Sequence, residues 1–102
     1  MKLLVIAEPA ARNLEGIVDY IALDNPVIAE SVYWGIVRAA EKLPEFPALG
    51  HPGRYPERRE LNIPGLPYMI VYEVGPEAVT IVAVFHTSRD PARALRDRMQ
   101  SC

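Results

Sequence analysis

Apolar positions divide the first part of the chain into a predicted strand and a predicted helix. Residues 3–7 are continuously apolar, and Glu8 with Pro9 ends the run, as expected of a first strand. Apolar residues then recur at the spacing i, i+3, i+4, i+7 of an amphipathic helix, at Leu14, Ile17, Val18 and Ile21. The pattern predicts a short strand followed by a helix with one buried face.

The tripeptide at residues 24–26 ends this helix and begins a second one. Asn25 can cap a helix N-terminus with its side chain, and Pro26 suits the first helical position, where an N–H needs no partner. Pro44 ends the second helix, whose predicted buried face consists of Ile28, Val32, Ile36, Ala39, Ala40 and Leu43. Two helices joined by so short a link are expected to pack as an antiparallel hairpin.

The period changes from helical to extended after a loop rich in proline and glycine at residues 44–56. Leu61 and Ile63 alternate with polar neighbours, and residues 68–74 and 79–85 are two β-rich runs joined by a short turn. These two runs predict a β-hairpin. Because residues 79–85 are apolar at almost every position, we expect them to form a central strand covered on both faces.

The end of the chain predicts one more helix. Asp90 and Pro91 repeat the cap-plus-proline signal, and Leu95 with Met99 marks one face of a short, arginine-rich helix. Two helices must then cover one face of a mostly antiparallel sheet, which predicts an α+β fold in two layers. With 102 residues, half of them hydrophobic, we expect one domain over residues 1–102.

Composition limits the compartment and the class of protein. The only cysteine, Cys102, has no partner in the chain, which excludes an internal disulfide and fits a reducing compartment. No apolar run reaches the ~20 residues that cross a bilayer. The apolar N-terminus is interrupted by Glu8 and Pro9 too early for a signal peptide. We therefore expect a cytoplasmic protein that does not enter the membrane.

The net charge of −2 is distributed unevenly along the chain. Residues 1–50 hold 4 Lys/Arg and 7 Asp/Glu, whereas residues 51–102 hold 7 Arg, no Lys and 6 Asp/Glu. Because arginine binds planar anions with two parallel hydrogen bonds, an arginine-only set indicates a binding face, with a solvated surface as the alternative. The overall acidity argues against a protein that coats nucleic acid nonspecifically.

Signatures of cofactor chemistry are missing. His51 and His86 are the only histidines, and no pair of carboxylates flanks either of them at the spacing of metal ligands. Residues 50–53 contain two glycines but lack the spacing and the lysine of a phosphate-binding loop. We therefore expect neither a metal nor a cofactor.

Polar residues on or beside the predicted sheet are candidates for RNA cleavage. Attack by a 2′-hydroxyl needs a base, an acid and cations around the phosphate. Glu60 or His86 could transfer the proton, with Arg59 and Arg89 as the cations, although a structural role for His86 is an alternative. Arg59 and Glu60 are neighbours on a strand and point to opposite faces unless a bulge intervenes. The same region offers Arg54, Arg58, Tyr68 and Tyr72 as binding residues, with sheet packing as an alternative for the two tyrosines.

A family pattern runs through nearly the whole chain in order. Its residues are Tyr20-Ile21-Ala22, Asp24-Asn25-Pro26, Ala29, Leu43, Phe46-Pro47, Gly50, Arg59-Glu60-Leu61, Ile63, Gly65, Pro67-Tyr68, Ile70, Tyr72, Val84, His86 and Arg89-Asp90. Together they resemble the RelE/ParE superfamily, the toxins of type II toxin–antitoxin systems that are often described as plasmid stabilisation systems. The resemblance implies a cognate antitoxin that neutralises the chain.

The resemblance leaves two targets open. ParE-like toxins poison DNA gyrase, whereas RelE-like toxins are strongly basic and cut mRNA in the ribosomal A site. The chain is acidic, its only lysines, Lys2 and Lys42, lie outside the loop and sheet that carry RelE catalysis, and its C-terminal helix is ParE-like. We favour gyrase poisoning through the arginine-rich C-terminal segment, with the residues Arg89, Arg93, Arg96 and Arg98. The alternatives are a ribosome-dependent endoribonuclease that uses Arg59, Glu60, His86 and Arg89, and a non-toxic partner of the antitoxin.

Overall fold

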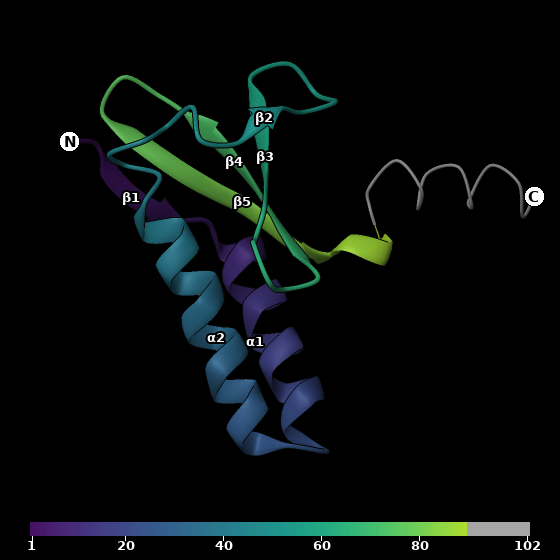
Figure 1. Cartoon of the computed structure of the whole chain (residues 1–102). Helices are drawn as coiled ribbons and strands as arrows, with labels where there is room; N and C mark the ends of the chain where they lie inside the picture. Colours follow the sequence, from purple (N-terminus) through teal and green to yellow (C-terminus); the bar gives the residue numbers. More distant parts are fainter. Residues whose placement is uncertain (90–102) are drawn as a thin grey trace, which may run out of the picture.

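The computed structural model describes residues 1–89, in which a helical hairpin packs on one face of a five-stranded sheet (Figure 1). The strands are β1 (Leu3–Ile6), β2 (His51–Pro52), β3 (Arg58–Asn62), β4 (Tyr68–Val74) and β5 (Ala78–His86). The helices are α1 (Glu8–Ala22) and α2 (Pro26–Glu41), and the 3-10 turn η1 (Thr87–Arg89) follows β5. The predicted α+β architecture is confirmed, and the predicted C-terminal helix lies outside the described residues.

The second helix begins as the sequence predicts and differs in one core position. The Asn25 side chain accepts a hydrogen bond of 3.2 Å from the backbone N–H of Ile28, and Pro26 is the first residue of α2. The predicted burial of Ile28 is wrong, because its side chain is 48% exposed while Ala29 is buried. Ala29 precedes the buried Ile36 by seven residues and is almost in line with it. Ile28 precedes Ile36 by eight residues, so the side chain of Ile28 is rotated about the helix axis by roughly 80° from that of Ile36 and away from the core.

The sheet order is β1-β5-β4-β3-β2, with β1 parallel to β5 and every other pair antiparallel. The predicted interior position of β5 is confirmed, since it pairs with β1 on one side and with β4 on the other. The predicted covering of both faces is wrong, because Val79, Ile81 and Val84 are buried against the helices while the opposite face of the strand is only half-buried. The strand buried without interruption is β4, from Tyr68 to Tyr72. The loop predicted at residues 44–56 also contains the short edge strand β2.

A β-bulge in β5 changes which side chains face the helices. Val71 pairs with Ala83 and Tyr72 pairs with Ile81, which leaves Val82 as an extra residue. Because one residue is added, Ile81 and Val84 lie on the same face although three positions separate them. The bulge carries His86 to this helix-covered face as well.

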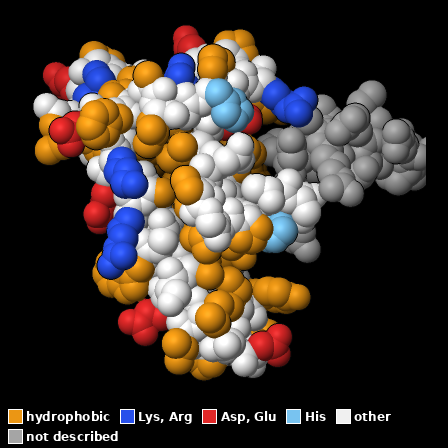
Figure 2. Space-filling view, viewed as in Figure 1, with side chains coloured by type: hydrophobic (Ala, Val, Ile, Leu, Met, Phe, Trp, Pro, Cys, Tyr) orange, Lys and Arg blue, Asp and Glu red, His pale blue; other side chains and the backbone are white. Residues whose placement is uncertain are grey.

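The hairpin leaves apolar side chains exposed at its far end. Tyr20 is 77% exposed, Leu23 is 82% exposed and Val27 is 74% exposed. Figure 2 shows hydrophobic side chains gathered at this end of the hairpin. Neither α1 nor α2, nor any other helix within residues 1–89, has the length and apolar character needed to cross a membrane.

Candidate functional site

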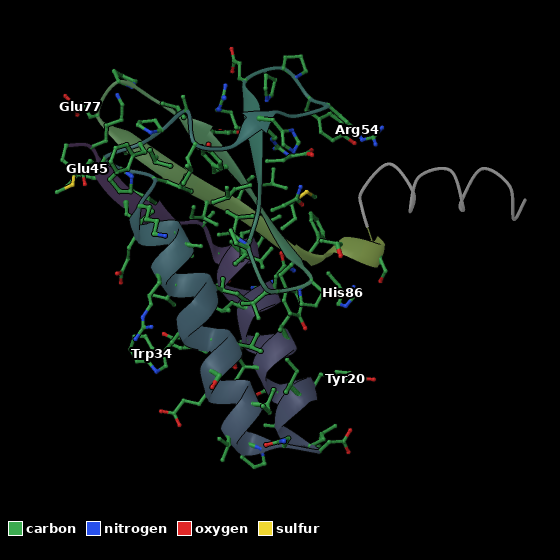
Figure 3. The ribbon with its side chains drawn as sticks, viewed as in Figure 1. Tyr20, Trp34, Glu45, Arg54, Glu77 and His86 are labelled. Atoms are coloured by element: carbon green, nitrogen blue, oxygen red, sulfur yellow. The ribbon has the colours of Figure 1, made fainter. Side chains whose placement is uncertain are left out.

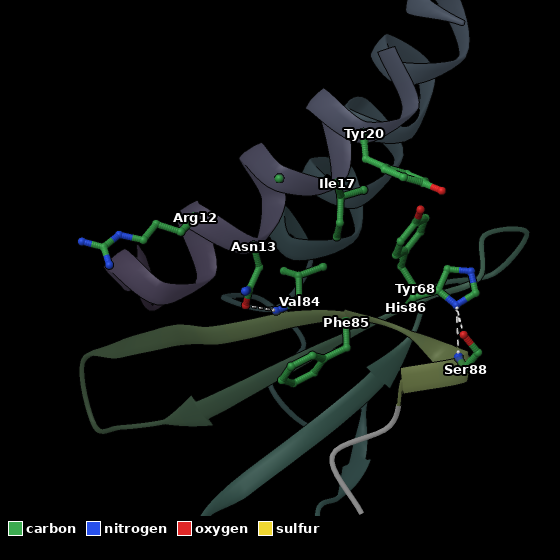
Figure 4. Close-up of a pocket in the computed structure, with 10 residues that line it drawn as sticks. Arg12, Asn13, Ile17, Tyr20, Tyr68, Val84, Phe85, His86 and Ser88 are labelled. Atoms are coloured by element: carbon green, nitrogen blue, oxygen red, sulfur yellow. Dashed lines mark hydrogen bonds between the residues drawn. The ribbon is translucent and has the colours of Figure 1, made fainter. Parts of the chain in front are cut away.

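A pocket of about 630 Å³ lies where α1 passes over the C-terminal end of β5 (Figure 4). Helix α1 contributes Arg12, Asn13, Gly16, Ile17 and Tyr20. The sheet and the turn after it contribute Tyr68, Val84, Phe85, His86 and Ser88. In Figure 3, Tyr20 and His86 project on the same side of the molecule, and Trp34 projects on the opposite side.

Tyr68 and His86 form the polar end of this pocket. They are directly opposite each other on β4 and β5, and their rings meet edge to face, with centroids 5.3 Å apart. The Nδ1 atom of His86 accepts a hydrogen bond of 3.1 Å from the backbone N–H of Ser88 and lies 2.7 Å from its hydroxyl oxygen. In the neutral ring the proton is therefore on Nε2, which faces away from Ser88 and can donate to a ligand.

Tyr68 is a largely buried residue whose hydroxyl stays open to solvent. The residue is 8% exposed, and its hydroxyl makes no hydrogen bond within residues 1–89. Figure 4 shows the hydroxyl pointing toward α1 and into the pocket. Desolvation by burial raises the pKa of Tyr68 above its ordinary value. The group is thus a neutral hydrogen-bonding group that faces the pocket.

Asn13 joins the two walls of the pocket. Its side-chain oxygen accepts a hydrogen bond of 3.2 Å from the backbone N–H of Val84, close to the bulge in β5. The amide nitrogen of Asn13 makes no hydrogen bond within the described chain and keeps both of its protons for other partners. Asn13, Gly16, Tyr20 and Ser88 were not predicted as site residues. Asn13 and Gly16 are poor helix formers inside a helix, which was the only signal of their role in the sequence.

Arg59 and Tyr72 hold the loop before β2 at the other end of the sheet. The Arg59 guanidinium donates to the backbone oxygens of Gly50 and Ala48, while its Nε is buried without a partner in the described residues. The Tyr72 hydroxyl donates to the Pro47 oxygen at 2.7 Å and accepts from the Gly50 N–H at 2.9 Å. Tyr72 is fully buried, which favours its packing role over contact with a partner.

The remaining predicted residues on the sheet lie apart from the pocket. Glu60 pairs with Val71 and with His51 on the face opposite Arg59. The Arg58 Nε donates to Glu73 at 3.1 Å, and the Arg58 guanidinium lies 5.7 Å from the centre of the Tyr55 ring. Arg54 is an exposed residue in the turn between β2 and β3.

The residues expected for RNA cleavage are thus not brought together in the described chain. Arg59 and Glu60 point to opposite faces, as expected for neighbours on a strand. Arg59 pairs with Tyr72 and His86 pairs with Tyr68, so the two residues lie on strands on opposite sides of β4. They are roughly 13 Å apart along the strand direction and two strand spacings, roughly 10 Å, apart across it. The backbone of Arg89 lies in η1, and the predicted binding residues Arg93, Arg96 and Arg98 lie outside the described residues.

The fold defines a class of known proteins. It matches a chain of the solved structure titled "Chromosomal ParDE TA system from P. aeruginosa" with a TM-score of 0.77 and 25% sequence identity, covering 84% of this chain and 96% of that one. A helical hairpin on this sheet, with this match, gives the chain the fold of a component of that ParDE TA system.

Two further comparisons give the family. The family model described as "ParE toxin of type II toxin-antitoxin system, parDE" matches residues 4–91. A protein of Sinorhizobium fredii (strain NBRC 101917 / NGR234), named "Putative toxin Y4kP", is 40% identical over 77 residues, which are 76% of this chain and 79% of that protein. The chain belongs to the ParE toxin family, as the sequence pattern predicts.

Proposed function

We propose that the chain stops bacterial growth by poisoning DNA gyrase and that a cognate antitoxin holds it inactive. The observation that carries the proposal is the ParE family match over residues 4–91, which spans every described element from β1 to η1. The solved relative is described as part of a ParDE toxin–antitoxin system, which supports an antitoxin partner here.

The geometry of the described residues supports a binding inhibitor over an endoribonuclease. General acid–base cleavage requires its proton donor, its proton acceptor and its cations within hydrogen-bond reach of one phosphate. Arg59 already donates to two backbone oxygens near the start of β3. Glu60 lies on the face of the sheet opposite Arg59. His86 is four pairs further along β4 than Arg59, at the C-terminal end of β5. One phosphate cannot contact all three groups in this arrangement.

The free edge of β1 supports strand addition as one way for the antitoxin to dock. The N–H of Leu3 donates to Glu77, just before β5, and the N–H of Ala7 donates to Ile81 in β5. By alternation the N–H and C=O of Leu4 and Ile6 therefore point to the outer edge. The outer edge of β1 is unpaired within residues 1–89, and Leu3, Val5 and Ile6 are 69%, 43% and 47% exposed. An apolar edge strand of this kind accepts an additional strand from a partner.

The target is tested with purified components. The purified chain is added to gyrase with plasmid DNA, and separately to ribosomes engaged with mRNA. We expect loss of supercoiling and accumulation of cleaved plasmid in the first reaction, with intact mRNA in the second. Cleaved mRNA together with unaffected gyrase would contradict the proposal, and His86→Gln and Glu60→Gln would then show which predicted residue carries the cleavage.

A further inference from the structure

The pocket between α1 and β5 contains a tyrosine hydroxyl that is open to solvent and that no described residue binds. Tyr68 is 8% exposed, its hydroxyl points into the pocket in Figure 4, and no group within residues 1–89 hydrogen-bonds to it. Because no described side chain or backbone group occupies this hydroxyl, it can donate to or accept from a ligand that enters the pocket.

Gly16 keeps the pocket open from the side of α1. Glycine inside a helix is less stable than alanine, so its presence there calls for a reason. Close packing is not the reason, because a β-carbon added at Gly16 would meet nothing within 4 Å. The missing side chain leaves space in the pocket instead.

The groups around this space suit a flat, neutral heterocycle. His86 offers Nε2, Asn13 offers its amide nitrogen, and the walls include the aromatic ring of Tyr20 and the aliphatic Ile17. A few convergent polar groups on aromatic and aliphatic walls are typical of small-molecule sites, and unpaired nucleobases bind by stacking on aromatic rings and hydrogen bonding along their edges. A volume of about 630 Å³ admits a ligand of this size.

Positive charge borders the pocket where a phosphate would lie. Arg12 is a lining residue, and its ion pair with Glu8 is exposed on both sides, with 74% of each side chain accessible. An exposed pair of this kind contributes little, so Arg12 can exchange Glu8 for a ligand anion. Ser88 lies on the opposite wall.

We propose that this pocket binds the base of an unpaired nucleotide, with the base against Tyr68 and His86 and the phosphate at Arg12. The site goes beyond gyrase poisoning and antitoxin binding, and its binding is measured on the purified chain without either partner. Its failure would therefore leave the proposed function untouched.

The experiment is an NMR titration of the full chain with the four nucleoside 5′-monophosphates, with ribose 5-phosphate as the probe that lacks a base. We expect saturable shifts at the amides of Gly16 and His86 with at least one nucleotide, and at least tenfold weaker binding of ribose 5-phosphate. No saturable shift at millimolar nucleotide would overturn the proposal. Equal binding of ribose 5-phosphate would also overturn it, because the site would then recognise phosphate alone.

Two variants locate the binding in the pocket. Gly16→Leu fills the open space and should weaken nucleotide binding at least tenfold while the circular dichroism spectrum stays unchanged. Tyr68→Phe removes only the hydroxyl and should weaken binding roughly three- to tenfold, the value of one hydrogen bond. The matched control is Tyr33→Phe, which removes a hydroxyl outside this pocket and should leave the affinity unchanged.

Wild-type affinity in Gly16→Leu would contradict the assignment. An equal loss in Tyr68→Phe and Tyr33→Phe would contradict it too. If Gly16→Leu does not fold, the comparison of Tyr68→Phe with Tyr33→Phe still decides the question.

Discussion

Two glycines illustrate how different demands on the backbone select the same residue type. A β-carbon at Gly50 would lie 2.6 Å from the Glu60 carbonyl oxygen and 2.8 Å from the Tyr72 hydroxyl, whereas one at Gly16 would meet nothing. We expect Gly50→Ala to lower the free energy of unfolding by about 1–3 kcal/mol through overpacking. Gly16→Ala should raise it by about 0.5–1 kcal/mol. Denaturant unfolding of both variants measures this, and changes of the same sign would contradict the described packing.

The protonation of Tyr68 links the pocket to alkaline stability. Burial raises the pKa of Tyr68 in the folded chain above its value of about 10 in the unfolded chain. The folded state therefore holds the phenolic proton more tightly than the unfolded state does. The resulting contribution of Tyr68 to the free energy of unfolding is complete below about pH 10 and is lost as the pH rises through the folded pKa. Between about pH 9 and 11, the free energy of unfolding should fall more steeply for the wild type than for Tyr68→Phe. Parallel pH profiles in denaturant unfolding would show that the environment of Tyr68 is wrong.

At the scale of elements, the edge of β1 gives a direct test of antitoxin docking. The Ile6 N–H points to the free edge by alternation, so proline at this position removes an edge donor without removing a bond to β5. Ile6→Pro should weaken antitoxin binding at least tenfold in a calorimetric titration, since proline also blocks close approach of an added strand. Ile6→Ala, the matched control, keeps the N–H and should lose less. Unchanged affinity in Ile6→Pro would exclude pairing at this edge.

The elements themselves could be predicted from the sequence because local signals define them. Asn25 with Pro26 placed the start of α2, and the β-rich runs placed β4 and β5 with errors of at most one residue at each end. These features depend on residues that are close to one another in the sequence, so a single sequence is enough to predict them.

The candidate site could not be predicted because it depends on contacts between distant segments. Counting alternate residues from Ile81 puts His86 on the opposite face, and only the extra residue Val82 reverses this assignment. The bulge leaves no mark in a run that is apolar at nearly every position. The pocket needs in addition the crossing of α1 over β5, where the Val84 N–H donates to the Asn13 side-chain oxygen across 71 positions of sequence.

At the scale of the whole molecule, the distribution of charge distinguishes the two possible targets. A chain with a net charge of −2 gains little from general attraction to ribosomal phosphate, so its contacts must come from a local group of arginines. Residues 89–98 hold four arginines, the largest number within any ten residues of the sequence.

The arginines of this segment are tested at constant net charge. Arg96→Ala with Arg98→Ala lowers the formal charge from −2 to −4, as does Arg38→Ala with Lys42→Ala on the hairpin. We expect the first pair to lower the inhibition of gyrase at least tenfold and the second pair to change it less than twofold, because loss of a charged contact costs more than a change in the distant field. Equal losses in both pairs would show that total charge, rather than this segment, determines activity.

Pulse labelling in cells is the most direct test of the proposed action on gyrase. The chain is induced without its antitoxin, and DNA synthesis and protein synthesis are followed separately from the first minutes. We expect an early fall in DNA synthesis with a DNA-damage response, while protein synthesis continues at first. An immediate collapse of protein synthesis, with DNA synthesis falling only later, would contradict it and identify the ribosome as the target.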